Sequence, residues 1–113
     1  MRPDLVLLSD IDQALAEAVT FAAGLSRSGF VDDHRSRGAV MYELIVVGEA
    51  AARVSAEVRG AHPEIEWPQI ISFRNRATHA YFAVDWDIVY DILSGDVPRL
   101  RAALVPILAE MGD

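Results

Sequence analysis

The chain has 113 residues, of which 52% are hydrophobic, and a formal net charge of −7 at pH 7. This length suits one hydrophobic core, so we expect residues 1–113 to form a single domain. No stretch approaches the roughly 18 to 20 apolar residues of a membrane helix, and the amino-terminal apolar run is too short for a secretory signal, which predicts a cytoplasmic protein. The absence of cysteine excludes disulfides and thiolate chemistry, and the negative charge restricts any nucleic-acid site to a local basic patch.

The apolar residues follow helical spacing almost throughout, without the two-residue alternation or Asn-Gly turns of a sheet. We therefore predict an all-α fold, an antiparallel bundle of about four to five helices. A first helix, capped by Ser9 or Asp10, should run to about Ser26. Its apolar stripe comprises Ile11, Leu15, Ala18, Phe21, Ala22 and Leu25. The following stretch "SRSGFVDD" is typical of a turn.

A second helix is expected from about Asp33 to Arg59, and its middle, "AVMYELIVVGEAAARV", is apolar on nearly every side. Such a helix must be covered on more than one face, which one small bundle does not readily supply. A homodimer that uses this helix is the simplest solution. On this view Val47→Glu would place an unpaired carboxylate in the interface and split the dimer.

Three further helices complete the expected bundle. "GAHPEIEWP" breaks the chain before a third helix from about Pro68 to Tyr81, where Pro68 suits the first turn. Asp85 can cap a fourth helix, "WDIVYDIL", which should end at "SGD". A fifth helix should span Val97 to Met111, with an apolar stripe of Leu100, Leu104, Ile107, Leu108 and Met111.

The stretch "RNRATHAY", residues 74–81, concentrates hydrogen-bonding groups on the third predicted helix. Arg74 and His79 are five residues apart, so an ideal helix separates them by about 140°. A helix that ends near His79, a long arginine reaching round, or a second copy across a two-fold axis could each bring them together. The pair suits RNA cleavage by the 2′-hydroxyl, because histidine moves protons near neutral pH and arginine binds phosphate.

The same residue types also have structural interpretations. Arginines near a histidine at a helix end are commonly solvated or paired with carboxylates. Glu49, in an apolar helix after Gly48, could orient Arg74 or Arg76 in a dimer cleft, or could lie on the rim with only its stem buried.

Two further sets of polar residues, three histidines and three aspartates, do not predict a site. His34, His62 and His79 lack the spacing of a helical metal pair. Asp85, Asp87 and Asp91 suit the capping of a helix start better than acid–base chemistry. We therefore expect no metal and no cofactor.

"RNRATHAY" resembles the RxxxxHxY signature of the HepT-like ribonuclease toxins, in the HEPN superfamily of helical domains. The resemblance extends through "LIVVGEAAARVS", "EWPQIISF" and "FAVDWDIVYDIL" and covers most of the chain. It implies a homodimeric helical bundle in which two motifs face one another and cut RNA without metal. Arg74 and His79 match the catalytic pair, and Asn75 follows the arginine as in much of the family. Arg76 and Glu49 complete the expected supporting residues on the residue types alone. Ala80 stands where many relatives have glycine.

The resemblance also implies a partner, a small nucleotidyltransferase antitoxin of the MNT type in a type II or related toxin–antitoxin system. In some such pairs the antitoxin transfers AMP to the motif tyrosine, which is Tyr81 here. AMP adds bulk and negative charge beside a phosphate site. A tyrosine that only packs its ring at a helix end is the structural alternative. A second function class also stays open, a non-catalytic helical dimer that binds the nucleotidyltransferase or a nucleotide.

Overall fold

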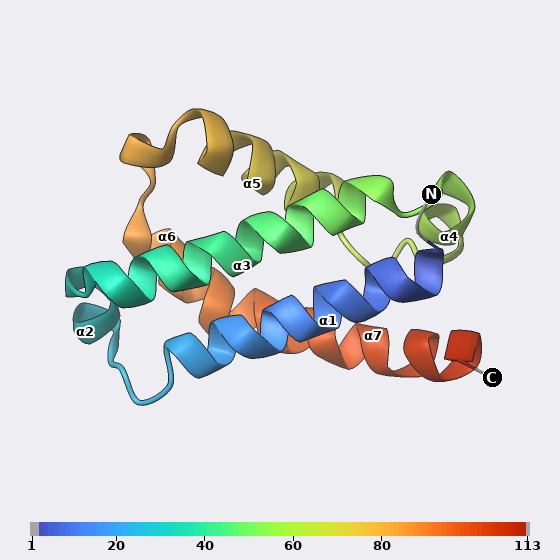
Figure 1. Cartoon of the computed structure of the whole chain (residues 1–113), viewed down its shortest axis with the longest axis horizontal. Helices are drawn as coiled ribbons and strands as arrows, with labels where there is room; N and C mark the ends of the chain where they lie inside the picture. Colours follow the sequence, from blue (N-terminus) through green and yellow to red (C-terminus); the bar gives the residue numbers. More distant parts are fainter. Residues whose placement is uncertain (1–2, 113) are drawn as a thin grey trace.

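The computed structural model describes residues 3–112, and these are almost entirely helical, with no strand among them. The described part measures 42 × 28 × 22 Å along its principal axes. Figure 1 shows long helices lying side by side, with α3 between α5 and α1 and with α7 packed against α1. The elements are α1 (Asp4–Phe21), α2 (Arg27–Asp32), α3 (His34–Arg53), α4 (Ala56–Ala61), α5 (Trp67–His79), η1 (Tyr81–Ala83), α6 (Trp86–Asp91), η2 (Ile92–Asp96) and α7 (Val97–Gly112).

Helix α1 begins at Asp4, one and a half turns before the Ser9 or Asp10 cap that the sequence predicted. Asp4 accepts hydrogen bonds from the backbone N–H and the hydroxyl of Ser55, at 2.9 and 2.8 Å. This contact and the burial of Leu7 and Leu8 extend the helix toward the amino terminus. The predicted stripe is largely confirmed, although Phe21 is 41% exposed. The helix also ends earlier than expected, before a turn at Gly24 with a φ of 81°.

The segment predicted as a turn at residues 26–33 contains the short helix α2, so that prediction was wrong. The Ser26 hydroxyl caps α2 by accepting from the N–H of Gly29, and Phe30 is fully buried. The predicted start of the next helix is confirmed, because the Asp33 carboxylate accepts from the N–H groups of Arg35 and Ser36.

The second predicted helix is divided into α3 and α4 instead of running to Arg59. The backbone of Val54 is extended, its side chain is buried, and the hydroxyl of Ser55 caps α4. The third predicted helix is confirmed at its start, where Pro68 lies in the first turn of α5. It ends at His79 and does not include Tyr81, which lies in the single turn η1.

The expected break at "SGD" is absent, because α6 continues through the π-turn η2 into α7. Pro98 lacks the N–H that a regular helix would use across this junction, which fits a local change of hydrogen-bond register. Asp85 caps α6 as predicted, by accepting from the N–H groups of Asp87 and Ile88. The structure adds the short helices α2 and α4 and joins the last two predicted helices. The predicted division into four to five helices was therefore wrong in detail, whereas the all-α class is confirmed.

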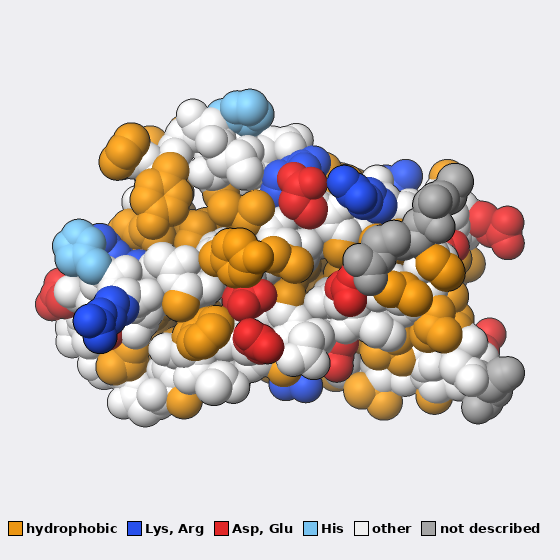
Figure 2. Space-filling model, in the orientation of Figure 1, with side chains coloured by type: hydrophobic (Ala, Val, Ile, Leu, Met, Phe, Trp, Pro, Cys, Tyr) orange, Lys and Arg blue, Asp and Glu red, His pale blue; other side chains and the backbone are white. Residues whose placement is uncertain are grey.

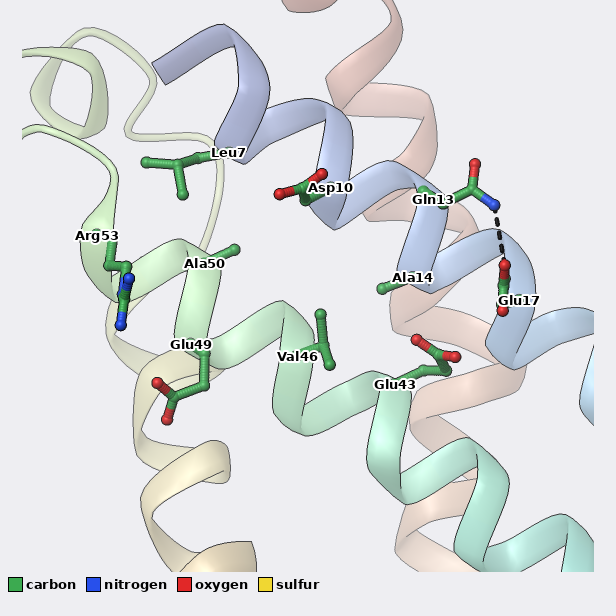
Figure 3. Close-up of a pocket in the computed structure, with 10 residues that line it drawn as sticks. All are labelled: Leu7, Asp10, Gln13, Ala14, Glu17, Glu43, Val46, Glu49, Ala50 and Arg53. Carbon is green, nitrogen blue, oxygen red and sulfur yellow. Dashed lines mark hydrogen bonds between the residues drawn. The ribbon is translucent and has the colours of Figure 1, made fainter. Parts of the chain in front are cut away.

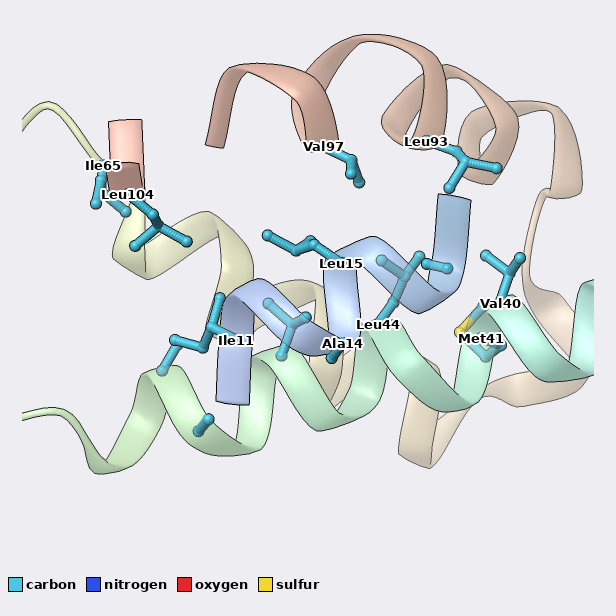
Figure 4. Packing of buried hydrophobic residues seen from close by; sticks show 14 of the residues in the cluster. Ile11, Ala14, Leu15, Val40, Met41, Leu44, Ile65, Leu93, Val97 and Leu104 are labelled. Atoms are coloured by element: carbon cyan, nitrogen blue, oxygen red, sulfur yellow. The ribbon is translucent and has the colours of Figure 1, made fainter. Parts of the chain in front are cut away.

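The core lies between α1, α3 and α7, where aliphatic side chains from all three helices meet (Figure 4). Helix α3 is covered by α1 on one flank and by α5 on another, so much of its apolar surface is buried within one chain. Val47 is only 4% exposed. Val47→Glu would therefore disturb the core of a single chain, and our expectation that it marks a dimer interface was wrong. None of the described helices is long and apolar enough to span a membrane.

Candidate active site

Helices α3 and α5 approach one another closely at Gly48. A methyl group at this position would overlap Cβ and Cγ of Arg74 and would lie 3.4 Å from the carbonyl oxygen of Ile70. The missing side chain of Gly48 therefore makes room for Arg74. Ile70, Arg74 and Ala77 are spaced by four and three residues, so this contact lies on the face of α5 that packs on α3.

Arg74 forms an ion pair with Glu49, which follows Gly48 on α3. The side chain of Arg74 is 18% exposed and that of Glu49 is 48% exposed. Arg74 Nε is buried and has no hydrogen-bond partner within residues 3–112. The guanidinium is thus fixed by its buried stem and by one carboxylate, while part of the group still reaches solvent. Of the two arginines that we considered as partners of Glu49, Arg74 is the one it contacts.

A groove of about 320 Å³ lies between α1 and α3, on the other side of Glu49. Figure 3 shows four carboxylates around it, from Asp10, Glu17, Glu43 and Glu49, with Arg53 at one end. Burial and the neighbouring Glu17 carboxylate raise the pKa of Glu43, which is only 8% exposed. So many acidic groups repel phosphate, and the groove is a poor path for nucleic acid.

His79 is the last residue of α5 and is exposed. Solvent and substrate can therefore reach the ring. Within residues 3–112, neither a hydrogen bond nor an ion pair joins Arg74 to His79. One of the three arrangements that could bring Arg74 and His79 together is present, because the helix ends at His79. Arg74 nevertheless points toward Glu49. Figure 2 shows basic and acidic side chains meeting where α5 lies against α3.

The two remaining residues of the predicted supporting set lie apart from the Arg74–Glu49 pair. Asn75 is exposed on α5. Arg76 donates to the hydroxyl of Ser72 at 2.8 Å and lines a second groove, of about 450 Å³, between α5 and α7. The structure therefore joins Glu49 to Arg74 and leaves Arg76 on a different side of α5.

The turn after His79 carries a row of aromatic rings. Tyr81 packs edge-on against Phe82 and against Trp86, with both ring centroids 5.9 Å away. Trp86 in turn contacts the fully buried Phe30 and lies under the guanidinium of Arg37. The helix does not persist to Tyr81, so the ideal two-turn spacing from Arg74 to Tyr81 does not apply. On a continuous helix, residues seven apart would leave one face about 20° apart, and the end of α5 at His79 removes that relation.

Two residues of this region were missed by the sequence analysis. Gly48 was noted only as the neighbour of Glu49, and its close approach to α5 becomes visible only when two helices are placed together. Phe82 was not considered at all, although it is fully exposed. A phenylalanine in an apolar sequence predicts burial, so nothing in its residue type indicated a surface position.

Comparisons with known proteins agree on one family. The model of the family described as "Ribonuclease HepT-like" matches residues 11–107. "Probable ribonuclease HepT" of Thermococcus cleftensis is 30% identical over 94 residues, which are 83% of this chain and 86% of that protein. "Putative RNase MJ1380" of Methanocaldococcus jannaschii is 27% identical, with the same two coverages. No solved structure matches the chain significantly.

Proposed function

This chain belongs to the ribonuclease HepT-like family, and we propose that it is a metal-independent endoribonuclease that uses Arg74 and His79. The observation that supports this proposal is the position of the Arg74 guanidinium. Arg74 lies on α5, the helix that ends at His79, and it is anchored by Glu49 and Gly48 of α3. The names "Probable ribonuclease HepT" and "Putative RNase MJ1380" of two relatives support the same activity.

Arg74 supplies the phosphate contact. Its planar guanidinium carries a permanent charge and can stabilise the extra negative charge of the pentacoordinate phosphorus. With Nη1 engaged by Glu49 and Nε buried, Nη2 is the donor group left for the substrate. Glu49 acts as a positioning residue, since it fixes the guanidinium without being required to touch the RNA.

His79 moves the proton. The neutral ring accepts the proton of a ribose 2′-hydroxyl while the 2′-oxygen bonds to phosphorus and the bond from phosphorus to the 5′-oxygen breaks. The products are a 2′,3′-cyclic phosphate and a 5′-hydroxyl, and the 5′-oxygen takes its proton from a protonated imidazole. A second copy of His79, contributed by a homodimer, fits this second task.

The outward face of α3 is the surface that we propose for the dimer. Tyr42 is 66% exposed and lies seven residues before Glu49, so both leave the same side of the helix. Hydrophobic side chains gather over the middle of α3 beside the acidic and basic ones (Figure 2). A partner bound here would lie next to the Arg74–Glu49 pair, which is where a shared cleft is needed.

Cleavage of a defined single-stranded RNA by purified protein tests this function. We expect Arg74→Ala and His79→Ala to abolish cleavage while circular dichroism and thermal denaturation stay close to those of the unmodified protein. Arg74→Lys should also cleave poorly, because an ammonium group cannot reproduce the planar fork. Full cleavage by either alanine variant would refute the assigned roles.

We further propose that the protein is the toxin of a toxin–antitoxin pair and that a nucleotidyltransferase antitoxin silences it by transferring AMP to Tyr81. The side chain of Tyr81 is accessible, being 41% exposed, and it lies two residues after His79. A nucleotidyl group attached there adds bulk and phosphate charge beside the site.

Intact-mass spectrometry with the partner and ATP tests this modification. Tyr81→Phe should keep its cleavage activity and gain no mass. An adduct that persists in Tyr81→Phe would exclude this site, and neutralisation without any adduct would indicate inhibition by binding alone.

A further inference from the structure

Phe82 is an apolar side chain without cover at the end of the candidate site. It is fully exposed and lies three residues after His79, in the turn η1. A phenylalanine stabilises a fold mainly through its burial, so the fold gains little from this exposed ring. Single exposed hydrophobic residues are common on proteins, and exposure alone identifies no site. Its surroundings are what distinguish Phe82.

The ring has one aromatic neighbour, Tyr81, which is itself packed on Trp86. Tyr81 packs against Phe82 at an interplanar angle of 87°, and Tyr81 also packs against Trp86 at 74°. Trp86 contacts the buried ring of Phe30, which anchors the row in the core. The aromatic row thus packs Tyr81 against Trp86, and the ring of Phe82 beside it is open to a flat ligand.

Charge makes such a contact valuable for RNA binding. The chain carries a net charge of −7, and the groove beside Glu49 is lined by carboxylates. Affinity from phosphate contacts is therefore limited to the few cations near α5. Stacking of a base on an aromatic ring does not depend on net charge, and one stacked base strengthens binding about tenfold or more.

We propose that Phe82 stacks on an unpaired nucleobase next to the cleaved phosphate, so that the enzyme selects single-stranded RNA. Bases within a duplex are stacked and paired and cannot lie on a side chain, whereas bases in loops and single strands can. This inference rests on the proposed ribonuclease function, because it places the base beside His79.

The test compares Phe82→Ala with Phe82→Trp on one single-stranded RNA. We expect Phe82→Ala to raise KM about tenfold, the scale of one lost stacking contact, with kcat within about twofold. Phe82→Trp should keep the KM of the unmodified protein, because its ring can also stack on a base. Val105→Ala is the matched control, since Val105 is 67% exposed on α7 and lies outside the site. An unchanged KM in Phe82→Ala alongside normal cleavage would overturn the inference and leave the ribonuclease function standing.

A binding measurement separates the two proposals. The probe is an RNA with a 2′-deoxy substitution at the cleavage position and 2-aminopurine beside it. Quenching of its fluorescence that is lost in Phe82→Ala supports stacking, even if the unmodified protein cuts no RNA and the ribonuclease proposal fails. Equal quenching in both proteins contradicts the inference. Dissociation of a dimer by Phe82→Ala in light scattering would also overturn it, by assigning the ring to the interface between copies.

Discussion

Glu49 has one defined task at the scale of single residues, which is to hold the guanidinium of Arg74. Its carboxylate is 48% exposed, so its ion pair contributes little to stability, and its value lies in orientation. We expect Glu49→Ala to lower kcat/KM for RNA by about tenfold or more, because small displacements of a catalytic group are costly. Glu49→Gln should recover part of the loss, since an amide oxygen can still accept from Arg74.

Single-turnover cleavage rates measure this effect. Glu110→Ala is a suitable control, because Glu110 is exposed on α7 and away from the site. Equal activity of Glu49→Ala and Glu110→Ala would show that the contact does not position Arg74 during the reaction.

Glu43 couples stability to pH. Its burial, and then the Glu17 carboxylate, raise its pKa above the ordinary value of 4.5. The folded protein therefore binds this proton more tightly than the unfolded chain, so the stabilising contribution of Glu43 is present at low pH and is lost as pH rises through the raised pKa. We expect Glu43→Gln to be more stable than the unmodified protein at pH 7.5.

Thermal denaturation at pH 7.5 and at pH 5 measures the linkage. The advantage of Glu43→Gln should shrink at the lower pH, where the native carboxyl is increasingly protonated, whereas Glu110→Gln should show no such trend. An advantage of equal size at both pH values would mean that packing, and not ionisation, distinguishes the variant.

Among the helix contacts, the packing of α5 on α3 depends on Gly48. Gly48→Ala must push Arg74 away from α3, because the added methyl overlaps its Cβ and Cγ. We expect this variant to lose stability and to lose cleavage activity together. Gly38 is the matched control on the same helix, since a Cβ there has no atom within 4 Å. Gly38→Ala should gain up to about 1 kcal/mol from helix propensity.

Chemical denaturation and cleavage rates of the two variants check this prediction side by side. If Gly48→Ala cleaved RNA as fast as Gly38→Ala, close packing at this position would not be what places Arg74.

Helix starts were easier to predict from the sequence than helix ends. Asp33, Pro68 and Asp85 act where they were expected, because capping chemistry is local. The early start of α1 depends on hydrogen bonds that Ser55, distant in sequence, donates to the Asp4 carboxylate. The break after α3 depends on the burial of Val54. Such tertiary contacts leave no local pattern, so the sequence could not indicate them.

The residues of the candidate site were likewise predictable only in part. The pattern of residues 74–81 indicated Arg74, His79 and Tyr81, and Glu49 was suspected because a carboxylate in an apolar helix needs a partner. The choice of Arg74 over Arg76 required the placement of α5 against α3. The end of the helix before Tyr81, and the exposure of Phe82, also required the fold.

Dimerisation is a property of the whole molecule, because it joins two chains through an exposed face. Since Val47 is buried within the chain, the test must use an exposed residue of α3. We expect Tyr42→Asp to shift a dimer toward monomer, because a charge in an apolar interface is costly. Val105→Asp is the control, with a nearly equal exposure of 67% against 66% for Tyr42. Light scattering at micromolar concentration that shows the same mass for both variants and the unmodified protein would exclude this face.

We propose that this chain cuts RNA without metal, with Arg74 and His79. The most direct measurement incubates the purified protein with mixed RNA in excess EDTA and identifies the ends of the products, with His79→Ala in parallel. We predict fragments with 2′,3′-cyclic phosphate and 5′-hydroxyl ends from the unmodified protein and intact RNA from His79→Ala. Cleavage that stops in EDTA and returns with a divalent cation, or that continues in His79→Ala, would contradict the account.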